Sequence, residues 1–140
     1  MRLARWLLVA ACLLPRIAGA QHPAVESTAT VRQLHATMIK PASEVIFNVG
    51  RAAPTKDEQW TALSGAGATL VKSGNLLMLA SPPENRAKWI TLCRQLVTAG
   101  RTARRAADTR HLDALMRTPD RLVVVCETCH ARYRKQGSQE

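Results

Sequence analysis

The sequence predicts an all-α protein whose four antiparallel helices form an up-and-down bundle. Glycine and proline gather at a few places and cut the chain into four long segments. In each segment apolar residues recur at spacings of three and four, which places them on one helical face. Short breaks between the segments favour antiparallel neighbours. The run Leu122 to Val125 is strand-like in composition, but no second strand candidate exists to pair with it, so we expect helix there as well.

The first 20 residues have the pattern of a cleaved secretory signal peptide. Two arginines precede an apolar stretch and then small residues at the cleavage position, in the order Arg2, Arg5, Trp6 to Leu14 and Ala18 to Ala20. The apolar stretch is shorter than the roughly 20 residues that span a bilayer. A lipoprotein signal ending at Cys12 is the alternative. We expect export to the periplasm and a single domain over residues 21–140 that is not transmembrane.

The charge of the chain favours an acidic partner over a nucleic acid. Removal of the three arginines of residues 1–20 lowers the formal net charge from +10 to +7. Aromatic residues for stacking on bases are scarce. The only dense group of arginines is predicted to lie on a helix and does not form a basic arm. That group contains Arg101, Arg104, Arg105 and Arg110. A positive surface can steer an acidic protein or favour a membrane surface, and composition does not separate these.

The first helix is expected from about Glu26 to Val49, with a kink at Pro41. Its inward face is expected to carry Val31, Leu34, His35, Met38, Ala42, Val45, Ile46 and Val49. The second helix is expected to begin at a capping box formed by Thr55 and Glu58. Its inward face contains Trp60, Leu63, Gly67, Leu70, Gly74, Leu77 and Met78. Gly67 and Gly74 are poor helix formers, so we expect them to permit close approach of a neighbouring helix.

The third helix is expected to begin at Ser81, with proline in its first turn. Its inward face contains Trp89, Leu92, Cys93, Leu96, Val97 and Gly100. The fourth segment begins near His111, and Thr118-Pro119 predicts a kink or a fresh helix start.

The fourth segment contains the sequence CETCH, in which Cys126, Cys129 and His130 project from one helical face. C-x-x-C-H is the attachment sequence of c-type haem: each thiol forms a thioether with a vinyl group, and the imidazole binds iron. The sequence therefore predicts one covalent haem c, with His130 as the proximal iron ligand.

Two other readings of these cysteines remain open. A structural disulfide between Cys126 and Cys129 suits an exported protein, but it would close a very small loop. A redox-active pair is expected to follow a strand and to begin a helix, and neither feature is predicted here. Zinc could use Cys126, Cys129 and His130 together with Cys93, but structural zinc sites pair one close doublet with another, and Cys93 stands alone. Cys93 is most simply a small core residue.

The chain resembles the class II cytochromes c, the cytochrome c-prime group. The resemblance rests on C-x-x-C-H-x-x-Y-R from Cys126 to Arg134, near the end of a four-helix chain, and runs from the first helix to Arg134. It implies a haem held between the first and last helices. It also implies that Arg134, with Arg132 as a weaker candidate, neutralises haem propionates, and that a homodimer through the first two helices is possible.

Two residues of the first helix compete for the other side of the iron. His35 and Met38 lie three apart on the apolar face, and either could be a sixth ligand. The resemblance implies an apolar residue in five-coordinate members and a methionine in low-spin members. In the methionine pattern a Leu-Met pair precedes Pro-Ala-Ser, whereas this chain has Leu34-His35 before Pro41. We expect His35 as the distal ligand, with Met38 and an open site as alternatives.

Three functions follow from these alternatives. A six-coordinate haem indicates an electron carrier that works with a redox partner protein. An open distal site indicates a binder of small gases such as nitric oxide or carbon monoxide, a role that the resemblance implies. An enzyme such as a peroxidase would need distal acid-base groups, and the first helix offers little beyond His35. We expect electron transfer and no enzymatic activity.

Overall fold

A computed structural model describes residues 29–80 and 84–134, and this part of the chain forms helices with no strand. The first helical segment contains α1 (Val31–Leu34), a π-helical turn η1 (His35–Ile39), α2 (Lys40–Phe47) and a 3-10 turn η2 (Asn48–Gly50). It is followed by α3 (Asp57–Leu79), α4 (Arg86–Asp108), α5 (Leu112–Met116) and α6 (Thr118–Tyr133). The all-helical prediction is confirmed, including helix over the strand-like run from Leu122. The expected leader and the start of the first helix at Glu26 lie outside the described residues.

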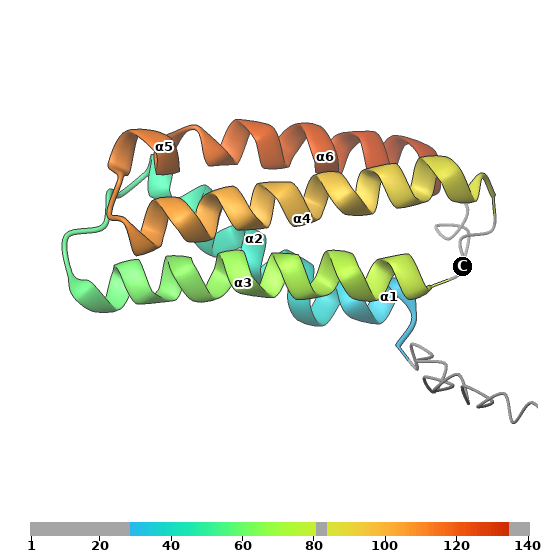
Figure 1. The fold of residues 1–140 in the computed structure, drawn as a ribbon, viewed down its shortest axis with the longest axis horizontal. Helices are drawn as coiled ribbons and strands as arrows, with labels where there is room; N and C mark the ends of the chain where they lie inside the picture. Colours follow the sequence, from blue (N-terminus) through green and yellow to red (C-terminus); the bar gives the residue numbers. More distant parts are fainter. Residues whose placement is uncertain (1–28, 81–83, 135–140) are drawn as a thin grey trace, which may run out of the picture.

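The helices lie side by side along the length of the molecule (Figure 1). The contact between α3 and α4 is the most extensive, and α6 packs against α4. The first helical segment lies against α3 and touches α6 less extensively. Helix α1 and the end of α6 lie at the same end of the molecule (Figure 1), and His35 of the first segment lies against His130 of α6.

The π-helical turn lies directly before Pro41, where the sequence predicts a kink. Proline has no N–H and its ring crowds the preceding turn, so an α-helix is disturbed there. The backbone N–H of Lys40 donates instead to the carbonyl of His35, five residues back. The buried residues Leu34 and Ile39 are accordingly five apart. Two expected inward residues are corrected, because Val31 and Val45 are exposed.

The helix starts differ in detail from the sequence expectations. Helix α3 begins at Asp57, and the side-chain oxygen of Gln59 accepts hydrogen bonds from the backbone N–H groups of Thr55 and Lys56 at 2.8 and 2.9 Å. Gln59 therefore satisfies the free N–H groups that the sequence assigned to a Thr55–Glu58 box. The expected cap Ser81 lies outside the described residues. Helix α4 begins at Arg86, after Asn85, whose side chain accepts from the N–H of Lys88.

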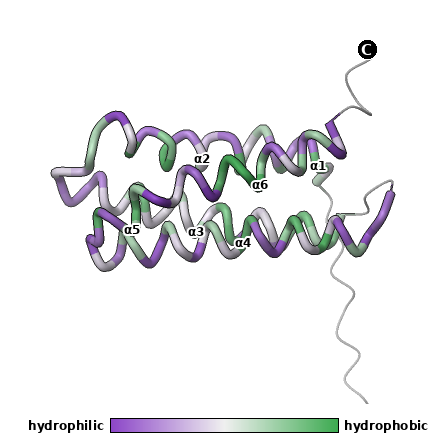
Figure 2. Tube along the Cα trace, turned by 90° about the horizontal axis from the view of Figure 1, so that it is seen from above, coloured by the Kyte–Doolittle hydropathy of each residue, from purple (hydrophilic) through white to green (hydrophobic). Residues whose placement is uncertain are grey.

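Close contact between α3 and α4 depends on glycine, as the sequence predicts. A methyl group added at Gly67 would lie 2.6 Å from the backbone nitrogen of Arg104 and 2.8 Å from the carbonyl oxygen of Gly100. A methyl group at Gly74 would lie 2.6 Å from the side chain of Val97. The core around this contact includes Leu63, Leu70, Leu77, Trp89, Leu96 and Ala103. The hydrophobic stretch of α6 stands out in Figure 2, and its residue Val124 is 62% exposed.

Candidate functional site

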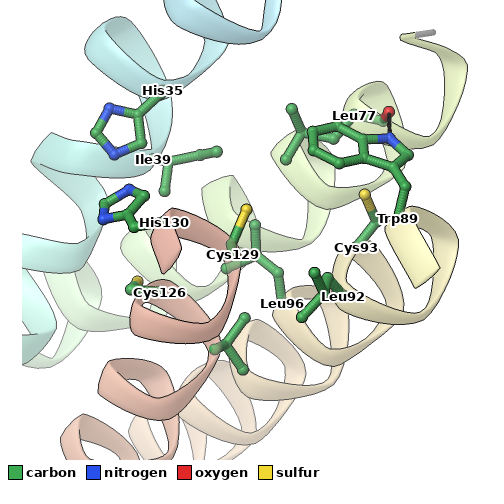
Figure 3. A pocket seen from close by; sticks show the side chains of 11 residues that line it. His35, Ile39, Leu77, Trp89, Leu92, Cys93, Leu96, Cys126, Cys129 and His130 are labelled. Carbon is green, nitrogen blue, oxygen red and sulfur yellow. Dashed lines mark hydrogen bonds between the residues drawn. The ribbon is translucent and has the colours of Figure 1, made fainter. Parts of the chain in front are cut away.

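Helix α6 directs Cys126, Cys129 and His130 into one cavity of about 50 Å³. The three positions follow from helical spacing, since residues three and four apart share a face. The rest of the lining is almost entirely apolar, and the first segment, α3 and α4 contribute to it. The other lining residues are His35, Ile39, Leu77, Trp89, Leu92, Cys93, Leu96 and Val125. Figure 3 shows the two histidines at one end of this cavity and the indole of Trp89 at the other.

His35 lies across the cavity from α6, with its ring centroid 5.3 Å from that of His130 and the ring planes at 60°. Met38 packs against the core but does not line the cavity. Burial lowers the pKa of the His35 imidazole, and the positive charges of His130, Arg134 and Lys40 lower it further. A lowered pKa keeps the imidazole neutral, and the neutral form is the one that binds a metal. The structure therefore brings His35, rather than Met38, to the position opposite His130.

The thiols of the site are held in their protonated form. Burial is the main cause that raises the pKa of Cys126 and of Cys129, and the pKa of Cys126 is raised further by the charges that Cys129 and Glu127 carry when they are ionised. Redox-active cysteine pairs have lowered pKa values because the thiolate is the reactive species. Cys93, Cys126 and Cys129 form no disulfide. The raised pKa values of the pair therefore disfavour a role in thiol-disulfide exchange.

Cys93 lines the same cavity from α4, which the sequence did not predict, although its burial as a core residue is confirmed at 2% exposure. Burial raises its pKa to about 12, with a further contribution from Cys129. Within residues 29–80 and 84–134, no group of three or more His, Cys, Asp or Glu side chains could hold a metal ion. The zinc reading thus has no ligand set in this part of the chain. An iron porphyrin differs, because it needs only one or two ligands from the protein.

Hydrogen bonds and ring contacts fix the far end of the cavity. The indole N–H of Trp89 donates to the backbone carbonyl of Leu77 at 2.7 Å, which joins the start of α4 to the end of α3 (Figure 3). The ring of Tyr133 packs edge-on against that of Trp89, with centroids 5.1 Å apart. Tyr133 thereby fixes the last turn of α6, one turn beyond Cys129 and His130. Ile39 was missed from the sequence, and its spacing of five from Leu34 is the signal that could have found it.

The basic residues at the end of α6 lie outside the cavity. Arg132 and Arg134 are both exposed, and neither lines the cavity. Arg134 is close enough to His35 for its positive charge to affect that imidazole. In the part of the chain that the structure describes, none of the helices has the length and apolar character needed to cross a membrane.

The chemistry of the donor set fits haem, whereas the cavity is smaller than a cofactor pocket. Two thiols on one helical face, an imidazole on each side and an apolar lining are the groups that a covalent haem uses. A cavity of about 50 Å³ is well below the roughly 300 Å³ of the smallest typical cofactor pockets. The first helical segment, which lines the cavity with His35 and Ile39, has limited contact with α6.

Comparison of the chain with models of protein families, with curated proteins and with solved structures gives no match.

Proposed function

We propose that this protein is an exported monohaem c-type cytochrome, similar to the class II cytochromes c, that transfers electrons. One observation carries the proposal: the three residues of the C-x-x-C-H sequence line a single apolar cavity, and His35 faces His130 across it. Such an arrangement gives covalent attachment on one side and an imidazole on each face. The antiparallel up-and-down arrangement of the four helices, and removal of residues 1–20 during export to the periplasm, are parts of this proposal.

Each residue of the site has a separate role in the proposal. Cys126 and Cys129 anchor the cofactor as thioethers, so that a small domain can retain it. His130 is the proximal ligand and His35 the distal one. Arg134, with Arg132 as a weaker candidate, pairs with the propionates from the solvent side. When bound, haem supplies a one-electron couple at its iron, and the protein sets the potential through these ligands and the apolar lining.

Electron transfer is favoured over gas binding because His35 lines the cavity beside His130, and its lowered pKa favours the neutral imidazole that binds a metal. A second ligand from the protein closes the iron to small molecules. A five-coordinate binder of nitric oxide or carbon monoxide remains the second candidate. The buried side chain of Ile39 supports this second candidate. It lies on the first segment near His35 and would give the iron an apolar neighbour opposite His130 if His35 were not bound.

Covalent haem is tested by producing the protein with haem-ligation machinery and measuring its mass. The mature protein should exceed its polypeptide mass by one haem, and the haem should stay attached in acidified organic solvent. Cys126→Ser/Cys129→Ser should lose this added mass. Cys93→Ser is the matched control and should keep it, since Cys93 lies in the same cavity but outside the attachment sequence. A mature protein with the mass of the bare polypeptide would refute the proposal.

The two candidate functions are separated by absorption spectra with and without carbon monoxide. A carrier with both imidazoles bound should show low-spin bands that do not shift with the gas. A high-spin spectrum that shifts on addition of carbon monoxide would replace electron transfer with gas binding.

A further inference from the structure

A second cavity, of about 330 Å³, lies between α4 and α6. We call it the outer groove. Its volume falls in the range of about 300 to 1,000 Å³ that is typical of ligand sites. Most of its residues are exposed polar side chains, and none is acidic. They are Thr91, Arg94, Gln95, Thr98, Ala99, Thr102, Arg121 and Val125.

The two arginines of the outer groove have no acidic partner among the described residues. The ion pairs there involve other side chains, namely Lys40–Glu44, Arg104–Asp108 and Arg110–Asp57. The three threonine hydroxyls of the groove donate to carbonyls of their own helix. Arg94 on α4 and Arg121 on α6 are therefore the charged donors of the groove, one on each wall. A guanidinium presents a planar fork of N–H donors that matches a carboxylate.

Val125 connects the outer groove to the candidate haem site. Its side chain lines the groove on one side and the cavity of Cys126, Cys129 and His130 on the other. The two spaces therefore share this residue as part of their wall. Because electron transfer slows steeply with distance, a shared wall is where a redox partner gains most from docking.

We propose that the outer groove is the docking site for an acidic surface of the redox partner protein, whose carboxylates bind Arg94 and Arg121 next to the Val125 wall. This inference rests on the proposed function. Charge complementarity identifies the partner's chemistry, because two unpaired guanidiniums attract carboxylates and steer the encounter. A concave groove between two helices suits a protruding acidic side chain better than a flat lipid surface.

The test uses the ferrous holoprotein and two one-electron oxidants of opposite charge. Hexacyanoferrate(III) is a trianion and tris(phenanthroline)cobalt(III) is a trication. Each takes one electron from the haem iron, which goes from Fe(II) to Fe(III) while the oxidant's metal is reduced by one. Arg94→Glu/Arg121→Glu should slow oxidation by the anion by roughly tenfold and speed oxidation by the cation at low ionic strength. Both effects should fade as salt is added.

Arg51→Glu/Lys72→Glu is the matched control. It changes the net charge by the same amount, and both residues are exposed and lie outside the groove. It should change the anion rate much less than the groove variant does. A glutamate hexapeptide is a probe for carboxylates: it should slow oxidation by the anion in the unmodified protein and lose this effect in the groove variant only.

Three results would overturn the inference. Equal slowing in the groove variant and the control would mean that net charge alone acts. Inhibition by the peptide that survives in the groove variant would place the acidic site elsewhere. Loss of binding to phosphatidylglycerol vesicles in the groove variant alone, with kinetics equal to the control, would make the groove a membrane contact. Failure of the proposed function is distinguishable from these, since a protein without haem gives no optical signal to follow.

Discussion

At the residue scale, the choice between electron transfer and gas binding depends on His35. It faces His130 across the cavity, whereas Met38, three residues later, does not reach the cavity. We expect His35→Ala to convert a low-spin ferric haem to high-spin, because one of two iron ligands is lost. Met38→Ala is the matched control and should leave the absorption spectrum unchanged. The opposite result, with the spin state changed by Met38→Ala alone, would transfer the distal role to the thioether.

Cys93 gives a second measurement at this scale, a count of thiols. With a pKa raised to about 12, Cys93 has a thiolate fraction on the order of 10⁻⁴ at pH 8. We expect no thiol of the mature native holoprotein to react with a disulfide reagent at that pH, and one thiol to react in guanidinium chloride. Two or three reactive thiols in denaturant would show that an attachment cysteine had stayed free.

At the scale of the elements, the contact between α3 and α4 depends on Gly67 and Gly100, which meet across it, and on Gly74, which lies against Val97. Gly67→Ala would place a methyl group against backbone atoms of α4, which cannot move aside as a side chain can. We expect a loss of about 1 to 3 kcal/mol in the free energy of unfolding. Gly65→Ala is the control, because nothing lies within 4 Å of its added methyl group. Denaturation by guanidinium chloride should show the control to be about 0.5 to 1 kcal/mol more stable than the unmodified protein.

Much of the helical arrangement could be predicted from residue spacing. The inward faces of α3 and α4 follow from apolar residues three and four apart, and the structure buries Leu63, Leu70, Leu96 and Val97 as expected. The fresh start at Thr118 is also confirmed. The placement of Cys126, Cys129 and His130 in one cavity follows from the same periodicity, because α6 is an uninterrupted α-helix.

Two details could not be predicted from the sequence. One is a local change in the number of residues per helical turn, and the other is which side chain accepts from the free N–H groups at a helix start. The π-helical turn before Pro41 shifts the face of the first segment, so that Ile39 turns inward and Val31 outward. A fixed spacing of three and four cannot represent such a turn. At the start of α3, Gln59 rather than Glu58 accepts from the free backbone N–H groups of Thr55 and Lys56. Both side chains can accept such hydrogen bonds, so the sequence alone did not separate them.

At the scale of the whole molecule, stability is expected to be uneven. Helices α3 and α4 share the most extensive contact, while the first segment meets α6 over a small area at a cavity of about 50 Å³. Regions with fewer packed contacts open more often. We expect amides of residues 31–50 to exchange hydrogen faster in Cys126→Ala/Cys129→Ala, which lacks the two thiols proposed to attach haem, than in the haem-containing protein. Amides of α3 and α4 are the internal control and should differ little, as measured by mass spectrometry.

Equal protection of residues 31–50 in the two proteins would contradict this expectation. It would mean that the first segment is held by α3 alone and does not respond to a group placed between it and α6.

The π-helical turn also affects which side chain of the first segment lies opposite His130. Such a turn contains one residue more than an α-helix would use over the same rotation, so it acts as an insertion within the helix. Residues before it are out of phase with those after it. Deleting one residue from Ala36 to Met38 would restore the phase and bring Leu34, an apolar residue, to the position four before Ile39. The length of the backbone, and not only the residue type, thus selects which side chain meets the cavity.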